Sequence, residues 1–248
     1  MPTPSASDPS CRAYRAHALD LPAAARRAGV QVVRIDFDWR VPLASPAFAV
    51  LSEAEHARAL RFLRVEDAQR SAATRVALRD VLGAALGVAP AAVRLVVADA
   101  GRPALDPAHR ASLDFNVSHA GDHALIAWAP AGRVGVDIER CGRVRGWRGL
   151  TREVCTAGEN TYLDTVPDAV RADAFMRIWA AKEALLKALG TGIAGGLNAF
   201  AVVPPRDPAT PAVQIVAPAS AAAGVAAFEA AWLDAAPGYA ACVAWTRG

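Results

Sequence analysis

The sequence predicts an α+β fold, arranged as a pseudodimer of two similar α+β subdomains. Helical and strand-like segments mix irregularly along the 248 residues, and 54% of the residues are hydrophobic, enough to bury a substantial core. Two pairs of segments also repeat in the same order. "VVRIDFD" from Val32 resembles "RVGVDIE" from Arg133, and "RVALRDVLGAALG" from Arg75 resembles "IWAAKEALLKALG" from Ile178. These offsets of 101 and 103 residues indicate a duplicated unit, although alanine-rich helices can also match by chance.

The first subdomain is expected over residues 29–131, after a loose N-terminal arm over residues 1–28 that has no sustained period. A strand is predicted over 30–39. Ser52, followed by acidic residues, indicates the N-cap of a helix over 51–63. A second helix over 68–86 ends at Gly87, a natural C-cap. Alternating apolar residues then predict short strands over 93–97, 115–117 and 124–128.

The second subdomain is expected over residues 132–248. Its first strand is predicted over 134–139, and helices are expected near Glu159 and over 170–189. Apolar segments then predict four more strands, over 200–203, 213–216, 226–232 and 239–245.

Composition excludes several classes of protein. The formal net charge of +3 is too small to favour nucleic-acid binding. No run of about 18 apolar residues and no signal peptide occurs, so we expect a cytoplasmic protein that does not bind membranes. The four cysteines are scattered, which predicts reduced thiols and no metal site built on sulfur.

A pair of acidic residues marks the first strand of the second subdomain. In "RVGVDIER", alternation places Gly135, Asp137 and Glu139 on one face, and the two acids lie about 7 Å apart along the backbone. Two carboxylates at this spacing can bind one Mg²⁺ ion, with Gly135 leaving room beside them. The alternative is a solvated acid pair at the end of a strand.

The helix over 170–189 carries a lysine in the centre of its apolar stripe. Burying the charge of Lys182 without a partner costs several kcal/mol, about 2–7 even for a neutral polar group, so we expect an anion nearby. Glu183 and Lys187 are spaced i,i+4, and the simplest interpretation is a surface ion pair. If this helix packs beside the 134–139 strand, however, Glu183 joins Asp137 and Glu139 around one cation.

Three segments, in this order, resemble the signature of the 4′-phosphopantetheinyl transferases: "FNVSHAGD", "VGVDIER" and "WAAKEALLKALGTG". The resemblance spans Leu51 to Phe200, and the length and repeat are similar to the Sfp-type branch, a pseudodimer. It implies a monomeric enzyme that transfers the 4′-phosphopantetheine arm of coenzyme A to a serine of an apo acyl, polyketide or peptidyl carrier protein. The other product is adenosine 3′,5′-bisphosphate.

The resemblance also implies roles for individual residues. Asp137, Glu139 and Glu183 would hold Mg²⁺ against the pyrophosphate of coenzyme A. The remaining roles are a proton-accepting base, contacts to the pyrophosphate and contacts to the adenosine end. The base would be Glu159 or a metal-bound water. His119 and Lys187 would contact the pyrophosphate, with Ser118 and Lys182 in the same pocket. The residues that would contact the adenosine end are Arg58, Arg102 and Pro103.

One position departs from the family pattern. Glu55 stands where the family has a lysine near the 3′-phosphate, and Arg61, Arg64 or Arg70 could compensate. For His119, the alternative to a phosphate contact is a purely structural role.

Two other functions would share some of these sequence features. A module that binds coenzyme A or a carrier protein without turnover would need the basic pocket but not all three acids. A magnesium-dependent nucleotide hydrolase would use clustered acids, but the sequence has no Walker-type glycine loop. A second site at Asp36, Asp38 and Asp80 is not expected, because Ala84 replaces the lysine there.

Overall fold

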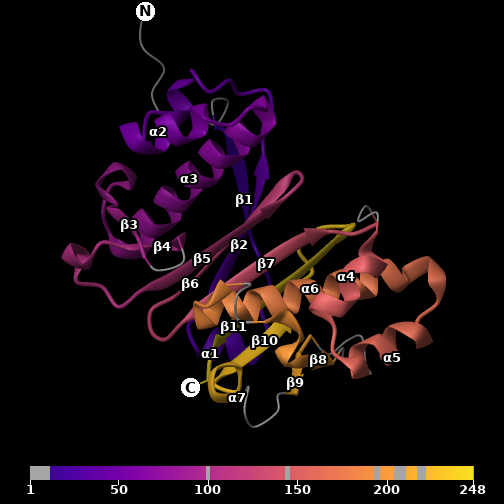
Figure 1. Ribbon diagram of the computed structural model, residues 1–248. Helices are drawn as coiled ribbons and strands as arrows, with labels where there is room; N and C mark the ends of the chain where they lie inside the picture. Colours follow the sequence, from indigo (N-terminus) through magenta and orange to yellow (C-terminus); the bar gives the residue numbers. More distant parts are fainter. Residues whose placement is uncertain are drawn as a thin grey trace, which may run out of the picture.

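Two antiparallel sheets lie edge to edge at the centre of the molecule (Figure 1). The computed structural model describes residues 12–98, 101–142, 146–192, 196–203, 211–216 and 222–247. The larger sheet has the strand order β1-β2-β6-β5, and the smaller sheet has the order β10-β11-β7. Strands β5 and β7 are the edges that face each other.

The first half contains the larger sheet and its covering helices. Its elements are β1 (Tyr14–Ala18), α1 (Ala23–Arg27), β2 (Gln31–Phe37), α2 (Glu53–Leu60), α3 (Val65–Leu86), β3 (Leu95–Val97), β4 (Pro103–Leu105), β5 (Asp114–Ala120) and β6 (His123–Ala129). Helix α3 packs on one face of the sheet over Ile35, Phe115 and Ile126.

The second half contains the smaller sheet. Its elements are β7 (Val134–Arg140), α4 (Trp147–Val154), α5 (Ala157–Thr165), α6 (Asp168–Leu189), β8 (Ala201–Val203), β9 (Gln214–Val216), α7 (Ala222–Val225), β10 (Phe228–Trp232) and β11 (Tyr239–Thr246). Short 3₁₀ helices lie at Pro46–Phe48, Pro90–Ala92, Pro107–His109 and Leu197–Ala199. Helix α6 crosses β7 and β11 and buries its apolar stripe against them (Figure 1).

The two halves share one topology, and the predicted α+β class is confirmed. In each half a strand is followed by a 22-residue helix, a small hairpin and two further strands. The resulting orders, β2-β6-β5 and β7-β11-β10, are equivalent. This equivalence supports the duplication that the sequence left open. The domain boundary at residues 131 and 132 lies between β6 and β7 and remains a prediction.

The caps of the helices agree with the sequence analysis. Ser52 accepts a hydrogen bond from the amide of Glu55, whose side chain accepts one from the amide of Ser52, so the predicted capping box is formed. Helix α3 ends at Gly87 and α6 at Gly190, both in the left-handed conformation.

The predicted loose arm over residues 1–28 is wrong for residues 12–28; residues 1–11 lie outside the described residues. Strand β1 pairs with β2, and Tyr14 is buried and donates a hydrogen bond to Asp80. Helix α1 buries Ala25 completely. The alternation in this edge strand, YRAHA, is only five residues long and relies on two alanines, and only Tyr14 of the strand is buried, so the sequence gives a weak strand signal here. The sequence patterns also did not predict helix α4.

Both halves contribute to one central core. Val134, Val136 and Ile138 of β7 pack with Val32 and Leu125 of the first half. This is the apolar face that alternation predicted for β7. Three free cysteines are described, at positions 141, 155 and 242. Within the described residues, no helix has the length and apolar character needed to cross a membrane.

Candidate active site

The edges of the two sheets are joined by polar side chains of β5. Asp114 accepts a hydrogen bond from the amide of Val134 at 2.8 Å, and Asn116 accepts one from the amide of Val136 at 3.0 Å. These side chains satisfy backbone donors that an edge strand would otherwise leave unpaired. The next residue on the same face of β5, Ser118, lies against Asp137 and so begins the site.

Gly135 allows α6 to approach β7 closely. A Cβ atom at this position would lie 2.1 Å from the carbonyl oxygen of Ala184 and 2.4 Å from the amide nitrogen of Ala188. The prediction that Gly135 leaves room for a cation is therefore wrong, because the helix backbone fills that room. This close contact brings Glu183 and Lys187 of α6 over the acidic face of β7.

Asp137 is at the centre of the polar contacts between β5, β7 and α6. Its side chain is 1% exposed, and Oδ1 accepts hydrogen bonds from Ser118 Oγ at 2.7 Å and Lys187 Nζ at 2.6 Å. The same ammonium lies 3.5 Å from Glu183 Oε2, and Glu183 Oε1 accepts a hydrogen bond from Trp179. The predicted i,i+4 pair is thus present, and it also contacts Asp137.

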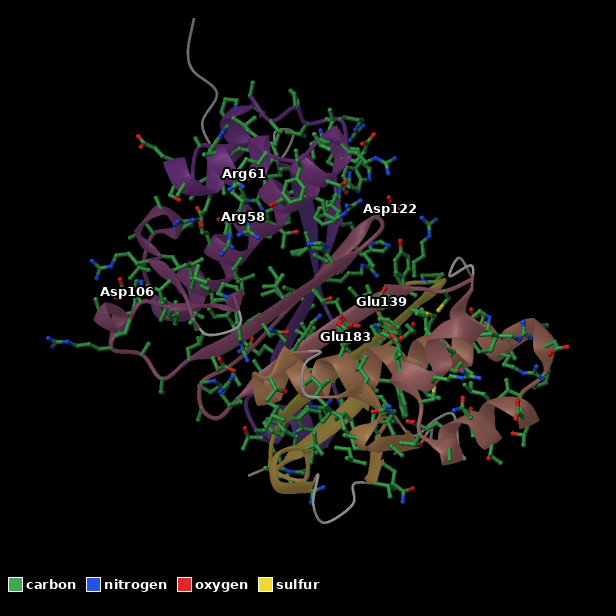
Figure 2. The ribbon with its side chains drawn as sticks, viewed as in Figure 1. Arg58, Arg61, Asp106, Asp122, Glu139 and Glu183 are labelled. Carbon is green, nitrogen blue, oxygen red and sulfur yellow. The ribbon has the colours of Figure 1, made fainter. Side chains whose placement is uncertain are left out.

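The three predicted metal ligands influence one another electrostatically. Burial, followed by the negative charges of Asp137 and Glu183, raises the pKa of Glu139 to about 7. Burial and Asp137 also raise the pKa of Glu183. Burial alone would lower the pKa of Lys187, but Asp137 and Glu183 outweigh it and raise that pKa. Figure 2 shows Glu139 and Glu183 near each other between β7 and α6.

The chemistry of these side chains suits a hard divalent cation. Asp137 Oδ2 is buried and has no hydrogen-bond partner among the residues that the structure describes. Carboxylate oxygens are the donors that Mg²⁺ prefers, and a cation would offset both the burial of Glu139 and the repulsion from Asp137 and Glu183, which together raise its pKa. No cluster of three or more histidine, cysteine, aspartate and glutamate side chains within the described ranges is already arranged as a metal site. The fit thus rests on the donor set and the orphaned oxygen.

Lys182 and Glu159 form a separate buried pair, so both predicted roles are wrong. Lys182 is fully buried, and its ammonium donates to Glu159 Oε2 at 2.6 Å and to the carbonyls of Val154 and Leu197. The anion expected beside this lysine is therefore Glu159, not a phosphate. Glu159 also accepts from the amide of Val202 and caps α5, and it is 3% exposed. A carboxylate with these contacts cannot reach a substrate hydroxyl.

Arg102 also differs from its predicted role at the adenosine phosphate. Its guanidinium donates to Asp114 at 2.8 Å and to the carbonyls of Lys187, Phe115 and Val134. Burial lowers its pKa, and Asp114 partly compensates. Arg102 thus fastens the end of α6 to β5 and β7. Ser118 is similarly committed to Asp137 and Lys187.

Three residues predicted to contact coenzyme A line one cavity of about 170 Å³ in the first half: Arg58, Pro103 and His119. The cavity lies between α2, α3 and β5, and its other lining residues are Glu55, Ser71, Thr74, Arg75, Leu78 and Val117. Sequence analysis missed Ser71, Thr74 and Arg75. Their spacing with Leu78, i, i+3, i+4 and i+7, was the available signal, because it places all four on one face of α3.

His119 connects this cavity with the carboxylates. It follows Ser118 on β5, so the two side chains project from opposite faces of the strand. Desolvation lowers the pKa of His119, and the nearby charges of Arg70 and Lys187 lower it further. Arg70 itself bonds Asp67 and the carbonyl of Gly121.

Other basic residues lie away from the cavity lining. Arg61 and Arg64 are exposed at the end of α2 and the start of α3, outside the lining. In Figure 2, Arg58 and Arg61 lie in the first half and Glu139 and Glu183 in the second.

The first half does not repeat the carboxylate trio. Asp36 lies on the face of β2 away from α3 and bonds Arg34 and His123, whereas Asp80 of α3 bonds Tyr14. Asp38 pairs with Arg40. The acids at these positions therefore bond separate partners.

Comparison with known proteins gives matches over both halves. Residues 133–244 match the 4′-phosphopantetheinyl transferase superfamily, and residues 42–131 match the family described as 4′-phosphopantetheinyl transferase, N-terminal. The 4′-phosphopantetheinyl transferase HetI of Nostoc sp. is 35% identical over 178 residues, 69% of this chain and 75% of that protein. The putative 4′-phosphopantetheinyl transferase slr0495 of Synechocystis sp. is 35% identical over 164 residues, 64% of this chain and 67% of that protein.

A solved structure also matches part of the chain. It is a holo-(acyl-carrier-protein) synthase from Bacillus anthracis in complex with CoA (3′,5′-ADP), at a TM-score of 0.38 and 16% identity. The match covers 47% of this chain and 96% of the synthase.

Proposed function

Because the chain belongs to the 4′-phosphopantetheinyl transferase superfamily, we propose that it moves the 4′-phosphopantetheine arm of coenzyme A to a serine of an apo carrier protein. The second product is adenosine 3′,5′-bisphosphate. The observation that carries this proposal is the meeting of Asp137, Glu139 and Glu183 beside Lys187, at the junction of the two halves.

The carboxylates are proposed to hold Mg²⁺ at this junction. Asp137 contributes the buried Oδ2, which has no other partner, and Glu139 and Glu183 contribute oxygens from β7 and α6. When bound, the ion would neutralise charge that develops on the pyrophosphate during transfer. Ser118 orients Asp137 by donating to its Oδ1.

Lys187 is proposed to act on the pyrophosphate as a fixed positive charge. Its raised pKa keeps the ammonium protonated at neutral pH, and its side chain is 26% exposed, so it can reach a bound anion. A charge held in place by Asp137 and Glu183 needs little reorganisation as negative charge develops on the leaving phosphate. His119 and the cavity beside it are proposed to position the adenosine end of coenzyme A.

The proton of the attacking serine is proposed to pass to solvent at the site. Glu159 is buried, with its oxygens bonded to Lys182 of α6, to the amide of Val202 in β8 and to the N-cap of α5, and cannot accept it. This leaves positioning and charge neutralisation as the main contributions of the chain, as in other phosphoryl transfers.

The test is Glu183→Gln, assayed with coenzyme A, Mg²⁺ and a panel of apo acyl, polyketide and peptidyl carrier proteins. Intact mass reports addition of the arm. We expect wild type to modify at least one carrier, and Glu183→Gln to lose about a hundredfold or more in rate, because a charge at the transition state is worth about 3 kcal/mol. Glutamine keeps an acceptor for Trp179, so the melting temperature should change little.

The matched control is Glu153→Gln, an exposed acid of α4. It should transfer at the wild-type rate. Normal transfer by Glu183→Gln would overturn the role of this carboxylate. Binding of coenzyme A and carrier by wild type, with no mass addition across the panel, would instead support the module that binds without turnover.

A further inference from the structure

The shared topology of the two halves gives the carboxylate site a counterpart in the first half. Helix α3 corresponds to α6 at an offset of 103 residues, so Asp80 and Ala84 stand where α6 has Glu183 and Lys187. Strand β1 lies beside β2 as β5 lies beside β7. The counterpart therefore keeps one acid on its helix and lacks the lysine.

The strand face at this counterpart is apolar. Val33, Ile35 and Phe37 of β2 pack with α3 in the core of the first half. The corresponding face of β7 carries Asp137 and Glu139 instead. Apolar side chains supply no oxygens to hold a cation and no charge to meet a pyrophosphate. A ligand at the counterpart must therefore differ in chemistry from the one expected at the carboxylates.

A groove of about 780 Å³ lies at this position. Helix α3 lines it with Val76, Asp80 and Ala84, and Tyr14 of β1 lies beside them. Its apolar walls come from the segment 46–50 and from the turn that follows α3. A volume of this size, lined mostly by apolar atoms with a few polar groups, is typical of sites for small organic ligands.

Asp80 is held in the groove by Tyr14. The phenol is 7% exposed and donates a hydrogen bond to Oδ2 of Asp80. Burial and the neighbouring carboxylate raise the pKa of Tyr14, so the phenol keeps its proton and remains the donor. The other oxygen, Oδ1, has no partner among the described residues and is not fully enclosed. One oxygen is therefore fixed, and the other is available to a ligand.

The negative charge of Asp80 has no counter-ion nearby. Within the described ranges, no cationic side chain forms a salt bridge with it, and its hydrogen-bond partner is the neutral Tyr14. Arg12 also lines the groove, but it is exposed, so water screens its charge. The half-buried Asp80 lies among apolar side chains, where a charge interacts more strongly. A complementary ligand has an apolar body and a cationic group.

We propose that this groove is a second binding site, which takes a small organic ligand with an apolar body and a protonated amine. The ammonium group donates to Asp80, and Tyr14 keeps the carboxylate in place. The apolar walls contact the body of the ligand. The duplicated half thus keeps a site at the equivalent position, with its preference changed from an anion to an organic cation.

The test uses three probes that share an indole ring and differ in charge: tryptamine, tryptophol and indolepropionate. Calorimetry on the full chain at neutral pH measures their affinities. We expect tryptamine to bind about tenfold more tightly than tryptophol, because a hydrogen bond between charged partners is the stronger kind, and indolepropionate to bind least.

NMR chemical shifts locate the bound probe. Tryptamine should shift the amide signals of α3 and of the segment 46–50. Excess coenzyme A should not displace it, because the groove shares no lining residue with the cavity beside His119.

Two variants separate the charge from the shape of the groove. Asp80→Asn keeps an acceptor for Tyr14, so it should weaken tryptamine about tenfold and change tryptophol less than about twofold. Ala84→Leu fills the groove at an exposed helical position that tolerates leucine, so it should weaken both probes. The control is Asp164→Asn, an exposed acid of α5, which should bind both probes like wild type.

The outcomes decide the inference without the transfer reaction. Equal affinities for tryptamine and tryptophol, or unchanged tryptamine binding in Asp80→Asn, would overturn it. Displacement by coenzyme A, or no binding of any probe at millimolar concentration, would overturn it as well. If Asp80→Asn lowers the melting temperature, Ala84→Leu decides instead, and unchanged tryptamine binding there would place the probe elsewhere. Because no carrier protein is present, the result is independent of whether the chain transfers the arm.

Discussion

Lys182 shows how a charged side chain can stabilise the interior of this fold. Its three donor hydrogens meet three acceptors, from α4, α5 and the 3₁₀ helix at Leu197–Ala199. Glu159 is equally satisfied, since both of its oxygens accept hydrogen bonds. A buried pair with complete hydrogen bonding escapes much of the desolvation cost of isolated charges. The pair thus fastens three segments to the back of α6, whose other flank carries Glu183.

Lys182→Met should therefore destabilise the protein strongly. Methionine fills similar volume but leaves Glu159 buried without its counter-ion, which costs about 3–5 kcal/mol. Denaturant unfolding measures the change. Adding Glu159→Gln to the same chain should recover part of the loss, because the amide retains the caps without a charge. Arg152→Met, on the exposed side of α4, is the control. A loss below about 1 kcal/mol for Lys182→Met would show that the pair is not important for stability.

The sequence predicted some site residues and not others for a physical reason. Asp137, Glu139, Glu183 and Lys187 follow from short periodicities, two along a strand and four along a helix, so their shared faces could be predicted. The acceptors of Lys182 and Arg102 come from segments far along the chain, and no local pattern encodes those pairings. An anion beside Lys182 was expected correctly, but its identity was not.

At the scale of elements, the contact between α6 and β7 places Glu183 of the helix above Asp137 and Glu139 of the strand. Small residues make it possible, since Gly135 faces Ala184 and Ala188 with no side chain between. Two of the carboxylates extend from the strand and one from the helix. Their distances are therefore set by how closely the helix approaches the strand.

Gly135→Ala should push α6 away from β7. The added methyl would meet the helix backbone, which cannot rotate aside as a side chain does, so we expect a loss of at least about 1–3 kcal/mol. Because Glu183 moves with α6, the rate of transfer should fall more than the fraction of folded protein. Melting curves and the mass assay measure the two effects. Gly149→Ala, where a Cβ meets nothing within 4 Å, is the control. Wild-type stability in Gly135→Ala would contradict the close approach.

Elements with strong local signals were predictable, and weakly patterned ones were not. Capping residues and glycine stops marked α2, α3 and α6, and apolar alternation marked the central strands. Strand β1 is held by pairing with β2 rather than by its own apolar face. Its place in the sheet depends on tertiary contacts that the sequence does not display locally.

At the scale of the molecule, the two halves share one topology, but the second half depends on contacts with the first. Strand β7 lies at the edge of its own sheet, and two of its amides bond side chains of β5. Its apolar face packs into a core that includes β2 and β6. The three acids proposed to hold Mg²⁺ lie in the second half and thus depend on the first half for their position.

The second half alone, residues 132–248, should therefore fail to fold cooperatively. Without the first half, Val134, Val136 and Ile138 would face water, and the edge of β7 would lose its polar partners. An exposed apolar edge strand favours aggregation over a stable sheet. Circular dichroism on heating should show no sharp transition for this fragment, and calorimetry should show no binding of coenzyme A. Co-expression with residues 1–131 is the control, and it should restore both properties if the halves reassociate. A sharp transition and tight coenzyme A binding by the fragment alone would mean that the shared core is dispensable, and that the site belongs to one half.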